Sequence, residues 1–379
     1  MTSVAGSSGT MAAPESLRVV IAGGGTGGHL FPGIAVAREI QSRVPGAQVS
    51  FVGTSRGIEA RVVPLEGFAL DLIRSSGIKG KSIPARAQGV AMLPLSLFDA
   101  WRVLSIRRPQ LVIGVGGYSS GPVVLVAAAR RIPTMLLEQN AVPGLTNRLL
   151  APFSRAVAVS FESTRVLFGA KAFLSGNPVR PEFLSPVDRI EAEKVANSRV
   201  RLLVFGGSQG AHAINMAMME GAAELVARVP DLRVTHQTGA RDLEMVRQAY
   251  RKAGLNAEVA AFFDDMPKRL VETDLIVCRA GATTLAEVTA TGRAAILVPL
   301  PGATDDHQRT NAEALTGAGA AEMLIQADMT GDKLADRIVA LANDAGRRDR
   351  ISAAARRLSR PDAARVIVDR ALDLMKTRP

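Results

Sequence analysis

The sequence predicts an α/β fold of two Rossmann-like domains, each a doubly wound parallel sheet, facing a central cleft. Short apolar runs alternate with stretches of helix length, which is typical of parallel strands joined by crossover helices. The alternation stops at a stretch rich in proline and charge, over residues 181–199, and then restarts. At 379 residues the chain also exceeds the length of one ordinary domain core.

The first domain is predicted over residues 17–180. Its seven expected strands cover residues 18–22, 49–53, 70–74, 111–115, 134–138, 157–161 and 172–175. Residues 1–16 are rich in Ser, Gly and Ala. They lack a basic start followed by an apolar stretch and a cleavage site, so we expect a disordered tail rather than a signal peptide.

The second domain is predicted over residues 200–360, after a linker at 181–199. Its six expected strands cover residues 201–205, 233–237, 259–263, 275–278, 295–298 and 322–325, and its closing helices cover 334–342 and 351–358. The segment 361–379 contains a last helix, started by Pro361 and Asp362. We expect this helix to pack back toward the first domain.

Two glycine-rich turns occupy matching places in the two halves, GGGTGGH at 23–29 and GGSQG at 206–210. Each follows an apolar run and opens an apparent helix. Glycine lets backbone amides close on a ligand, and a helix start presents unpaired N–H groups to an anion. We therefore expect two phosphate-binding domains with a ligand between them, although tight turns without a ligand are the alternative.

The composition argues against several functions. A net charge of +11 favours an anionic partner, but only 4% of residues are aromatic and no zinc-finger spacing occurs, so nucleic acid is not expected. No apolar run reaches the roughly 20 residues that span a bilayer. Cys278 is the single cysteine, which fits a reducing cytosol. The scattered histidines lack metal-ligand spacing, so no metal site is expected.

Residues 78–108 are the predicted membrane contact. Apolar side chains such as Leu95, Phe98 and Trp101 are interspersed with basic ones such as Arg102. A basic amphipathic helix beside a tryptophan can rest on anionic lipid headgroups. The alternative is an ordinary helix that packs on the core.

His29 is the candidate catalytic base. In the first turn of a helix its cationic form is disfavoured by the helix dipole, which keeps the imidazole neutral near pH 7. A neutral imidazole facing a cleft can deprotonate a hydroxyl group. A capping or hydrogen-bonding histidine is the alternative.

Three further motifs lie where predicted strands lead into helices. GGYSSGP at 116–122 either cradles a second diphosphate or caps a helix. RAGATTLAE at 279–287 offers hydroxyls and amides for a diphosphate and a carboxylate for a ribose diol, with a capping box of Thr284 and Glu287 as the alternative. DDHQRTN at 305–311 puts Gln308 and Asn311 on one helix face.

Taken in order, GGGTGGHLFPG, GGYSSGP, EQN, GNPVR, FGGSQGA, FFDDM, CRAGATTLAE and DDHQRTNA resemble the MurG family, and the match runs from about residue 18 to the C-terminus. The resemblance implies a GT-B fold without a cofactor. It also implies inverting transfer of N-acetylglucosamine (GlcNAc) from UDP-GlcNAc to the C4 hydroxyl of undecaprenyl-diphosphate-linked muramyl-pentapeptide. That reaction takes place at the cytoplasmic face of the membrane, where the enzyme is peripheral.

The resemblance also implies site residues by position. The donor set is Thr26, Gly27, Gly28, Asn140, Arg180, Ser208, Phe263, Ala282, Thr283, Thr284, Leu285, Ala286, Glu287 and Gln308. Within it, Phe263 stands where the uracil is held, Glu287 matches the ribose-binding carboxylate and Gln308 matches a residue that contacts GlcNAc hydroxyls. His29 matches the catalytic residue, and Gly116, Gly117 and Tyr118 lie in the acceptor region. Leu137 departs from the family, which often has a histidine before EQN.

Two other functions remain open from the sequence. A non-hydrolysing UDP-GlcNAc 2-epimerase resembles the same architecture and donor, but it needs neither a basic amphipathic surface nor an acceptor loop. A non-catalytic nucleotide-sugar sensor or membrane adaptor would bind without releasing UDP.

Overall fold

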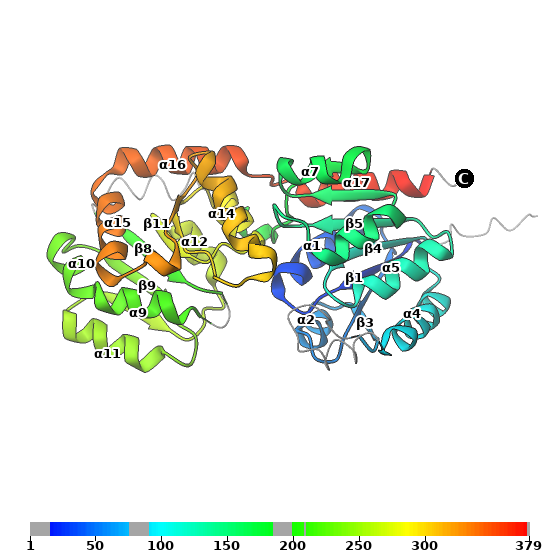
Figure 1. Ribbon diagram of the computed structural model, residues 1–379, viewed down its shortest axis with the longest axis horizontal. Helices are drawn as coiled ribbons and strands as arrows, with labels where there is room; N and C mark the ends of the chain where they lie inside the picture. The colour runs from blue at the N-terminus through cyan, green and yellow to red at the C-terminus, as the bar shows by residue number, and fades with distance from the viewer. Residues whose placement is uncertain (1–15, 76–90, 185–198, 208–209, 377–379) are drawn as a thin grey trace, which may run out of the picture.

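The computed structural model describes residues 16–75, 91–184, 199–207 and 210–376. Two parallel sheets, each covered by helices on both faces, form two lobes that lie end to end (Figure 1). Prediction and structure therefore agree on the fold class.

The first sheet has seven parallel strands in the order β3-β2-β1-β4-β5-β6-β7. They are β1 (Arg18–Gly23), β2 (Gln48–Gly53), β3 (Ala69–Leu72), β4 (Leu111–Gly116), β5 (Thr134–Glu138), β6 (Ala156–Val159) and β7 (Ala172–Leu174). The helices are α1 (Gly27–Arg43), α2 (Glu59–Leu65), α4 (Leu93–Arg107), α5 (Ser120–Ala129), α6 (Leu145–Leu150) and α7 (Glu162–Phe168), and short 3₁₀ turns are η1 (Ala151–Phe153), η2 (Gly169–Lys171) and η3 (Pro181–Phe183). The strand order reverses between β1 and β4, which is where such sheets bind ligands.

The second sheet repeats this topology in the order β10-β9-β8-β11-β12-β13. Its strands are β8 (Arg201–Phe205), β9 (Arg233–Gln237), β10 (Ala257–Ala260), β11 (Leu275–Cys278), β12 (Ala294–Leu297) and β13 (Glu322–Met323). The helices are α9 (His212–Glu220), α10 (Ala222–Arg228), α11 (Leu243–Ala253), α12 (Met266–Glu272), α13 (Ala282–Thr291), α14 (His307–Gly317), α15 (Gly331–Asn343) and α16 (Ala345–Leu358), with 3₁₀ turns η4 (Thr304–Asp306) and η5 (Gln326–Asp328). Its own switch point lies between β8 and β11.

All thirteen strands expected from the sequence are present, most of them within two residues of the predicted bounds. The largest difference concerns the strand expected at 259–263, which is found two residues earlier as β10. Phe263 lies beyond the strand because its N–H donates to the side chain of Gln237 (2.9 Å) instead of to a neighbouring strand.

The chain returns to the first domain at its end. Helix α16 packs in the core of the second domain through Ala354 and Ala355, whereas α17 (Ala363–Lys376) packs on α1 through residues that include Ile367 and Leu374. Asp369 of α17 also pairs with Arg43 of α1 (2.6 Å). Figure 1 shows α17 lying beside the first sheet. Residues 359–362 therefore cross between the domains.

Candidate active site between the two domains

The first glycine-rich turn interlocks with the turn that follows β4. A Cβ added at Gly23 would lie 2.3 Å from the carbonyl oxygen of Gly116, and one added at Gly117 would lie 2.6 Å from the carbonyl oxygen of Gly24. All four residues also have positive φ angles, which side chains disfavour. The structure thus brings together two motifs that lie more than ninety residues apart, and only glycine allows this approach.

His29 lies on this double turn. Its Nδ1 is 3.2 Å from Thr26 Oγ1, and a Cβ added at Gly116 would lie 2.7 Å from His29 Cδ2 and 3.0 Å from Nε2. Burial lowers the pKa of His29 to about 4, and the nearby His307 lowers it further. The imidazole is therefore neutral near pH 7, as expected, although burial rather than the helix dipole is the main cause.

The side chain of Glu59 packs against the first glycine-rich turn and bonds to its backbone. Its buried carboxylate accepts hydrogen bonds from Gly25 N (2.7 Å), Thr54 N (2.9 Å) and Thr54 Oγ1 (3.0 Å). A Cβ at Gly57 would lie 2.0 Å from Glu59 Oε2, so this glycine makes room for the carboxylate. Gly25 is therefore not one of the unpaired amides expected at the first turn, because an acid of the chain itself binds its N–H.

The start of α13 contacts the start of α1. Thr283 Oγ1 donates to the carbonyl oxygen of Gly28 (3.1 Å) and accepts from Asn177 Nδ2 (3.4 Å). The N-cap of α13 is Gly281, so Thr284 lies inside the helix and the alternative of a Thr284–Glu287 capping box was wrong. Two helix N-termini, each with a positive partial charge, therefore meet at one place, which favours an anion there.

Arg180 and Glu287 form a second contact between the domains. Arg180 Nη2 lies 3.7 Å from Glu287 Oε1, and the guanidinium carbon lies 5.2 Å and 4.9 Å from the ring centroids of Phe31 and Phe183. Within the described part of the chain, the buried Nε of Arg180 has no hydrogen-bond partner. Burial raises the pKa of Glu287 to about 7, and Arg180 opposes this rise.

Asn311 ties Asn140 to the second domain. Its Oδ1 accepts from Ala141 N (2.8 Å), and its Nδ2 donates to Asn140 Oδ1 (3.1 Å) and to the carbonyl oxygen of Ala280 (3.3 Å). The side chain is fully buried. The position of Asn140 is therefore fixed by a residue of α14.

Phe263 and Gln308 lie in the second domain. Arg269 packs its guanidinium carbon 3.8 Å from the Phe263 ring centroid. Gln308 Oε1 accepts from Ala280 N (3.2 Å) and Leu300 N (3.0 Å). Because both partners are donors, the oxygen of the amide is engaged and its NH₂ is the end of the side chain left to donate.

Among the described residues, no group of three or more His, Cys, Asp or Glu side chains is arranged to hold a metal ion. Nor is any helix in that part of the chain long and apolar enough to cross a membrane.

Comparisons with known proteins match this architecture. Residues 19–159 match the glycosyltransferase family 28 N-terminal domain and residues 201–367 the glycosyltransferase family 28 C-terminal domain. The chain is 48% identical, over 96% of its length and 94% of the relative, to the UDP-N-acetylglucosamine--N-acetylmuramyl-(pentapeptide) pyrophosphoryl-undecaprenol N-acetylglucosamine transferase of Anaeromyxobacter sp. (strain K).

The chain belongs to the MurG family. A crystal structure of MurG from Acinetobacter baumannii has a TM-score of 0.77 at 32% identity, covering 94% of this chain and 99% of that one. A UDP-GlcNAc 2-epimerase from Neisseria meningitidis has a TM-score of 0.66 at 13% identity, over 94% of this chain and 99% of that one. The second likeness concerns the fold alone.

Most residues that the MurG family resemblance predicts for the donor meet at the contact between the domains. Thr26, Gly27 and Gly28 start α1, Thr283 and Thr284 start α13, Arg180 faces Glu287, and Asn140 reaches α14. The side chains of Ala282, Leu285 and Ala286 instead line a cavity behind α13. Ser208 lies outside the described residues.

Of the predicted acceptor residues, Gly116 lies beside His29. Gly116 and Gly117 form the double turn, and the side chain of Tyr118 is exposed. Leu137, the departure from the MurG family, is buried in the core of the first sheet and therefore does not face the site.

Three residues that the sequence left out of the predicted site help to build it: Glu59, Asn177 and Asn311. Asn311 had a signal, since it shares a helix face with Gln308, and Asn177 belongs to the GNPVR motif. Glu59 had none, because its partner Gly25 is 34 residues away.

Proposed function

We propose that this protein transfers GlcNAc from UDP-GlcNAc to the C4 hydroxyl of undecaprenyl-diphosphate-linked N-acetylmuramoyl-pentapeptide, with inversion, in peptidoglycan synthesis. The observation that carries the proposal is the meeting of the α1 and α13 starts beside His29, through the Thr283–Gly28 hydrogen bond. It occurs in a chain 48% identical to a transferase of that name. A diphosphate leaving group and a base are the two things that the reaction requires.

In this proposal the donor diphosphate binds at the start of α13, where Thr283 and Thr284 offer backbone amides and hydroxyls. Negative charge grows on the β-phosphate as UDP leaves, and amides fixed at a helix start stabilise it without reorganising. Glu287, when ionised, accepts from the ribose diol, and the Gln308 NH₂ donates to a sugar hydroxyl. The backbone beside Phe263 holds the uracil.

The base is His29. It is neutral at pH 7, so it can accept the C4 proton at Nε2 while Nδ1 bonds to Thr26 Oγ1. As the acceptor oxygen attacks the anomeric carbon, UDP leaves from the opposite face. The acceptor diphosphate, held near Gly116 to Tyr118, brings negative charge that raises the pKa of His29 and makes it a better base.

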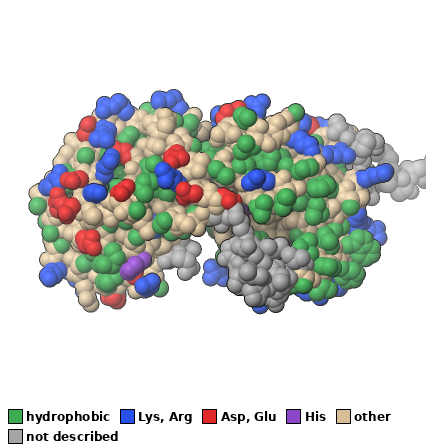
Figure 2. All heavy atoms as spheres, in the orientation of Figure 1, with side chains coloured by type: hydrophobic (Ala, Val, Ile, Leu, Met, Phe, Trp, Pro, Cys, Tyr) green, Lys and Arg blue, Asp and Glu red, His purple; other side chains and the backbone are tan. Residues whose placement is uncertain are grey.

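An anionic membrane surface is the proposed partner of the first domain, on the cytoplasmic face. Helix α4 exposes Leu95, Phe98, Trp101 and Ile106, and the rings of Phe98 and Trp101 stack at 6.4 Å. Leu104 faces the core, so the helix serves both packing and exposure. Residues 78–90 of the predicted membrane contact lie outside the described residues. Figure 2 shows hydrophobic side chains gathered over the first domain, whereas the second domain presents mixed charges.

One assay separates the candidate functions. UDP release is measured with UDP-GlcNAc alone and with a short-chain lipid-linked muramyl-pentapeptide added. Release that depends on the acceptor is expected. Formation of UDP-ManNAc from UDP-GlcNAc alone would identify an epimerase, and binding without UDP release would identify a sensor or adaptor.

Sedimentation with vesicles tests the membrane proposal. The protein is expected to bind phosphatidylglycerol vesicles more than phosphatidylcholine vesicles. A Phe98→Ser, Trp101→Ser variant is expected to bind less, while Met245→Ser, an exposed apolar residue of the second domain, leaves binding unchanged. Equal binding by both variants would contradict the assignment to α4.

A further inference from the structure

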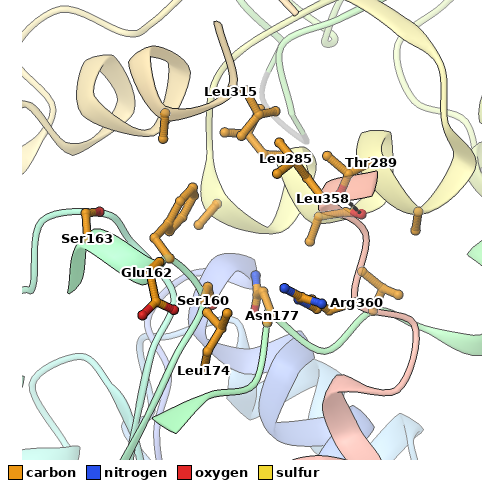
Figure 3. Close-up of a pocket in the computed structure, with 17 residues that line it drawn as sticks. Ser160, Glu162, Ser163, Leu174, Asn177, Leu285, Thr289, Leu315, Leu358 and Arg360 are labelled. Atoms are coloured by element: carbon orange, nitrogen blue, oxygen red, sulfur yellow. Dashed lines mark hydrogen bonds between the residues drawn. The ribbon is translucent and has the colours of Figure 1, made fainter. Parts of the chain in front are cut away.

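A cavity of about 350 Å³ lies behind α13, between the two domains. We name it the hinge cavity. Its second-domain wall comes from α13, α14 and the end of α16, and its first-domain wall from the segments after β6 and β7 (Figure 3). It lies where residues 359–362 cross between the domains, since Leu358 and Arg360 both line it.

The hinge cavity is distinct from the donor site because α13 turns two different faces to them. Ala282, Leu285, Ala286, Thr289 and Ala290 line the cavity, at the spacing of one helix face. Thr283 and Glu287 face Gly28 and Arg180 instead. The predicted donor run 282–287 therefore divides between two surfaces.

The cavity has one cationic, polar side. Figure 3 shows the Arg360 guanidinium beside Asn177, pointing into the space. Asn177 is only 6% exposed, and its Oδ1 has no hydrogen-bond partner among the described residues. In the same part of the chain no carboxylate pairs with Arg360, and the carboxylate of Glu162 points away from the space in Figure 3.

The opposite side is apolar. Leu285 and Leu315 approach from the second domain and Leu358 from the end of α16 (Figure 3). Phe161 of the first domain also lines the cavity. Leu285 and Leu315 are buried, whereas Leu358 and Arg360 are exposed. A space that joins an apolar wall to a few convergent polar groups is typical of small-molecule sites, and its volume lies at the small end of their range.

We propose that the hinge cavity binds a small amphipathic anion. A carboxylate or phosphate head accepts hydrogen bonds from the Arg360 guanidinium and from the Asn177 Nδ2–H that Thr283 does not use, and an apolar body packs on Leu285, Leu315 and Leu358. Such a ligand touches both domains. It therefore favours the domain arrangement in which Thr283 contacts Gly28, and Asn177 links the two places through its hydrogen bond to Thr283.

Phenylbutyrate is a suitable probe, because it joins a carboxylate to an apolar body. In methyl NMR spectra of the full chain it is expected to shift the Leu285, Leu315 and Leu358 signals saturably. The exposed Leu95 and Leu149, which lie outside the cavity, should not respond. Inorganic phosphate alone should bind more weakly, since it lacks the apolar body.

Arg360→Gln tests the cationic side. It removes a charge-assisted hydrogen bond and is expected to weaken phenylbutyrate binding about tenfold or more. Arg357→Gln, an exposed arginine of α16 outside the cavity lining, is the control and should bind like the unaltered protein. Absence of saturable shifts at the three leucines would overturn the proposal. So would equal affinity for neutral phenylbutanol, or equal affinity in Arg360→Gln.

Discussion

The two domains meet through the first turns of α1 and α13. The two turns differ in whether a carboxylate of the chain itself binds a backbone N–H there. In the first domain, the Glu59 carboxylate already binds the Gly25 N–H. Neither α1 nor α13 has a side-chain cap or an acidic residue in its own first turn, but before α13 it is the neutral amide of Gln308 that binds the N–H of Ala280. An external anion therefore meets an internal negative charge beside the first turn and only a neutral amide before α13.

This difference suggests different roles for the two domains, which the similar glycine-rich turns in the sequence did not reveal. On the first side, glycines make room for backbone, for Glu59 and for the His29 ring, so the turn positions the side chain that we propose as the base. On the second side, we propose that the start of α13 binds the donor diphosphate. A glycine-rich turn by itself therefore indicates a tight backbone rather than a phosphate site.

The largest expected effect comes from removing the base. His29→Ala should lower kcat by about 10²–10⁴-fold at saturating substrates, because proton transfer contributes a factor of that size. The KM for UDP-GlcNAc should change little, since the proposed donor contacts come mainly from residues of α13, Glu287 among them. Steady-state UDP release measures both. Near-normal kcat in a folded His29→Ala enzyme would remove His29 from the mechanism.

Displacing the base should have the next largest effect. In Gly116→Ala the new Cβ would meet the His29 ring, and we expect kcat to fall about 10²-fold because small misplacements of reacting groups are costly. Gly46→Ala is the matched control: Gly46 has a similarly positive φ of +83°, but its Cβ would meet nothing within 4 Å. Equal activity of the two variants would show that the ring position is unimportant.

Glu59→Gln tests the internal acid. Glutamine keeps the shape but brings an NH₂ group opposite the N–H of Gly25 or of Thr54, which should cost about 1–3 kcal/mol of unfolding free energy. Urea unfolding measures the loss, and calorimetric titration should find UDP affinity unchanged. Glu39→Gln, a partly exposed residue of α1, is the control. A loss of UDP affinity in Glu59→Gln would indicate that the donor binds at the first glycine-rich turn, contrary to our proposal.

Glu287→Gln should have the smallest effect, about tenfold on the KM for UDP-GlcNAc near pH 8, as expected for a hydrogen bond to a charged group. The folded pKa of about 7 lies above the ordinary 4.5, so Glu287 ionises only as the pH rises through 7. Donor KM should accordingly fall with pH through 7 in the unaltered enzyme and stay flat in the variant.

The same shift has a consequence for stability. Between pH 4.5 and 7 the folded protein holds a proton that the unfolded chain releases, so this contribution is present below pH 4.5 and is lost as the pH rises through 7. Thermal unfolding at pH 5 and pH 8 should show a smaller difference for Glu287→Gln than for the unaltered protein. An unchanged difference would mean that Glu287 titrates normally.

The sequence by itself determined the strands, their division into two sheets and the positions of most candidate site residues. These depend on local signals: runs of β-branched residues, glycines before helices, and motifs such as RAGATTLAE. The boundary error at 259–263 arose where a side chain, Gln237, replaced a strand as the partner of Phe263.

Tertiary structure alone decided which groups meet. Glu59 reaches Gly25 across 34 residues, and Asn311 reaches Ala141 across 170, through hydrogen bonds that no local pattern encodes. It also decided which face of α13 meets Gly28 and Arg180 and which lines the hinge cavity. A side chain's neighbours follow from how helices pack on sheets, and that packing is a property of the whole chain rather than of any one segment.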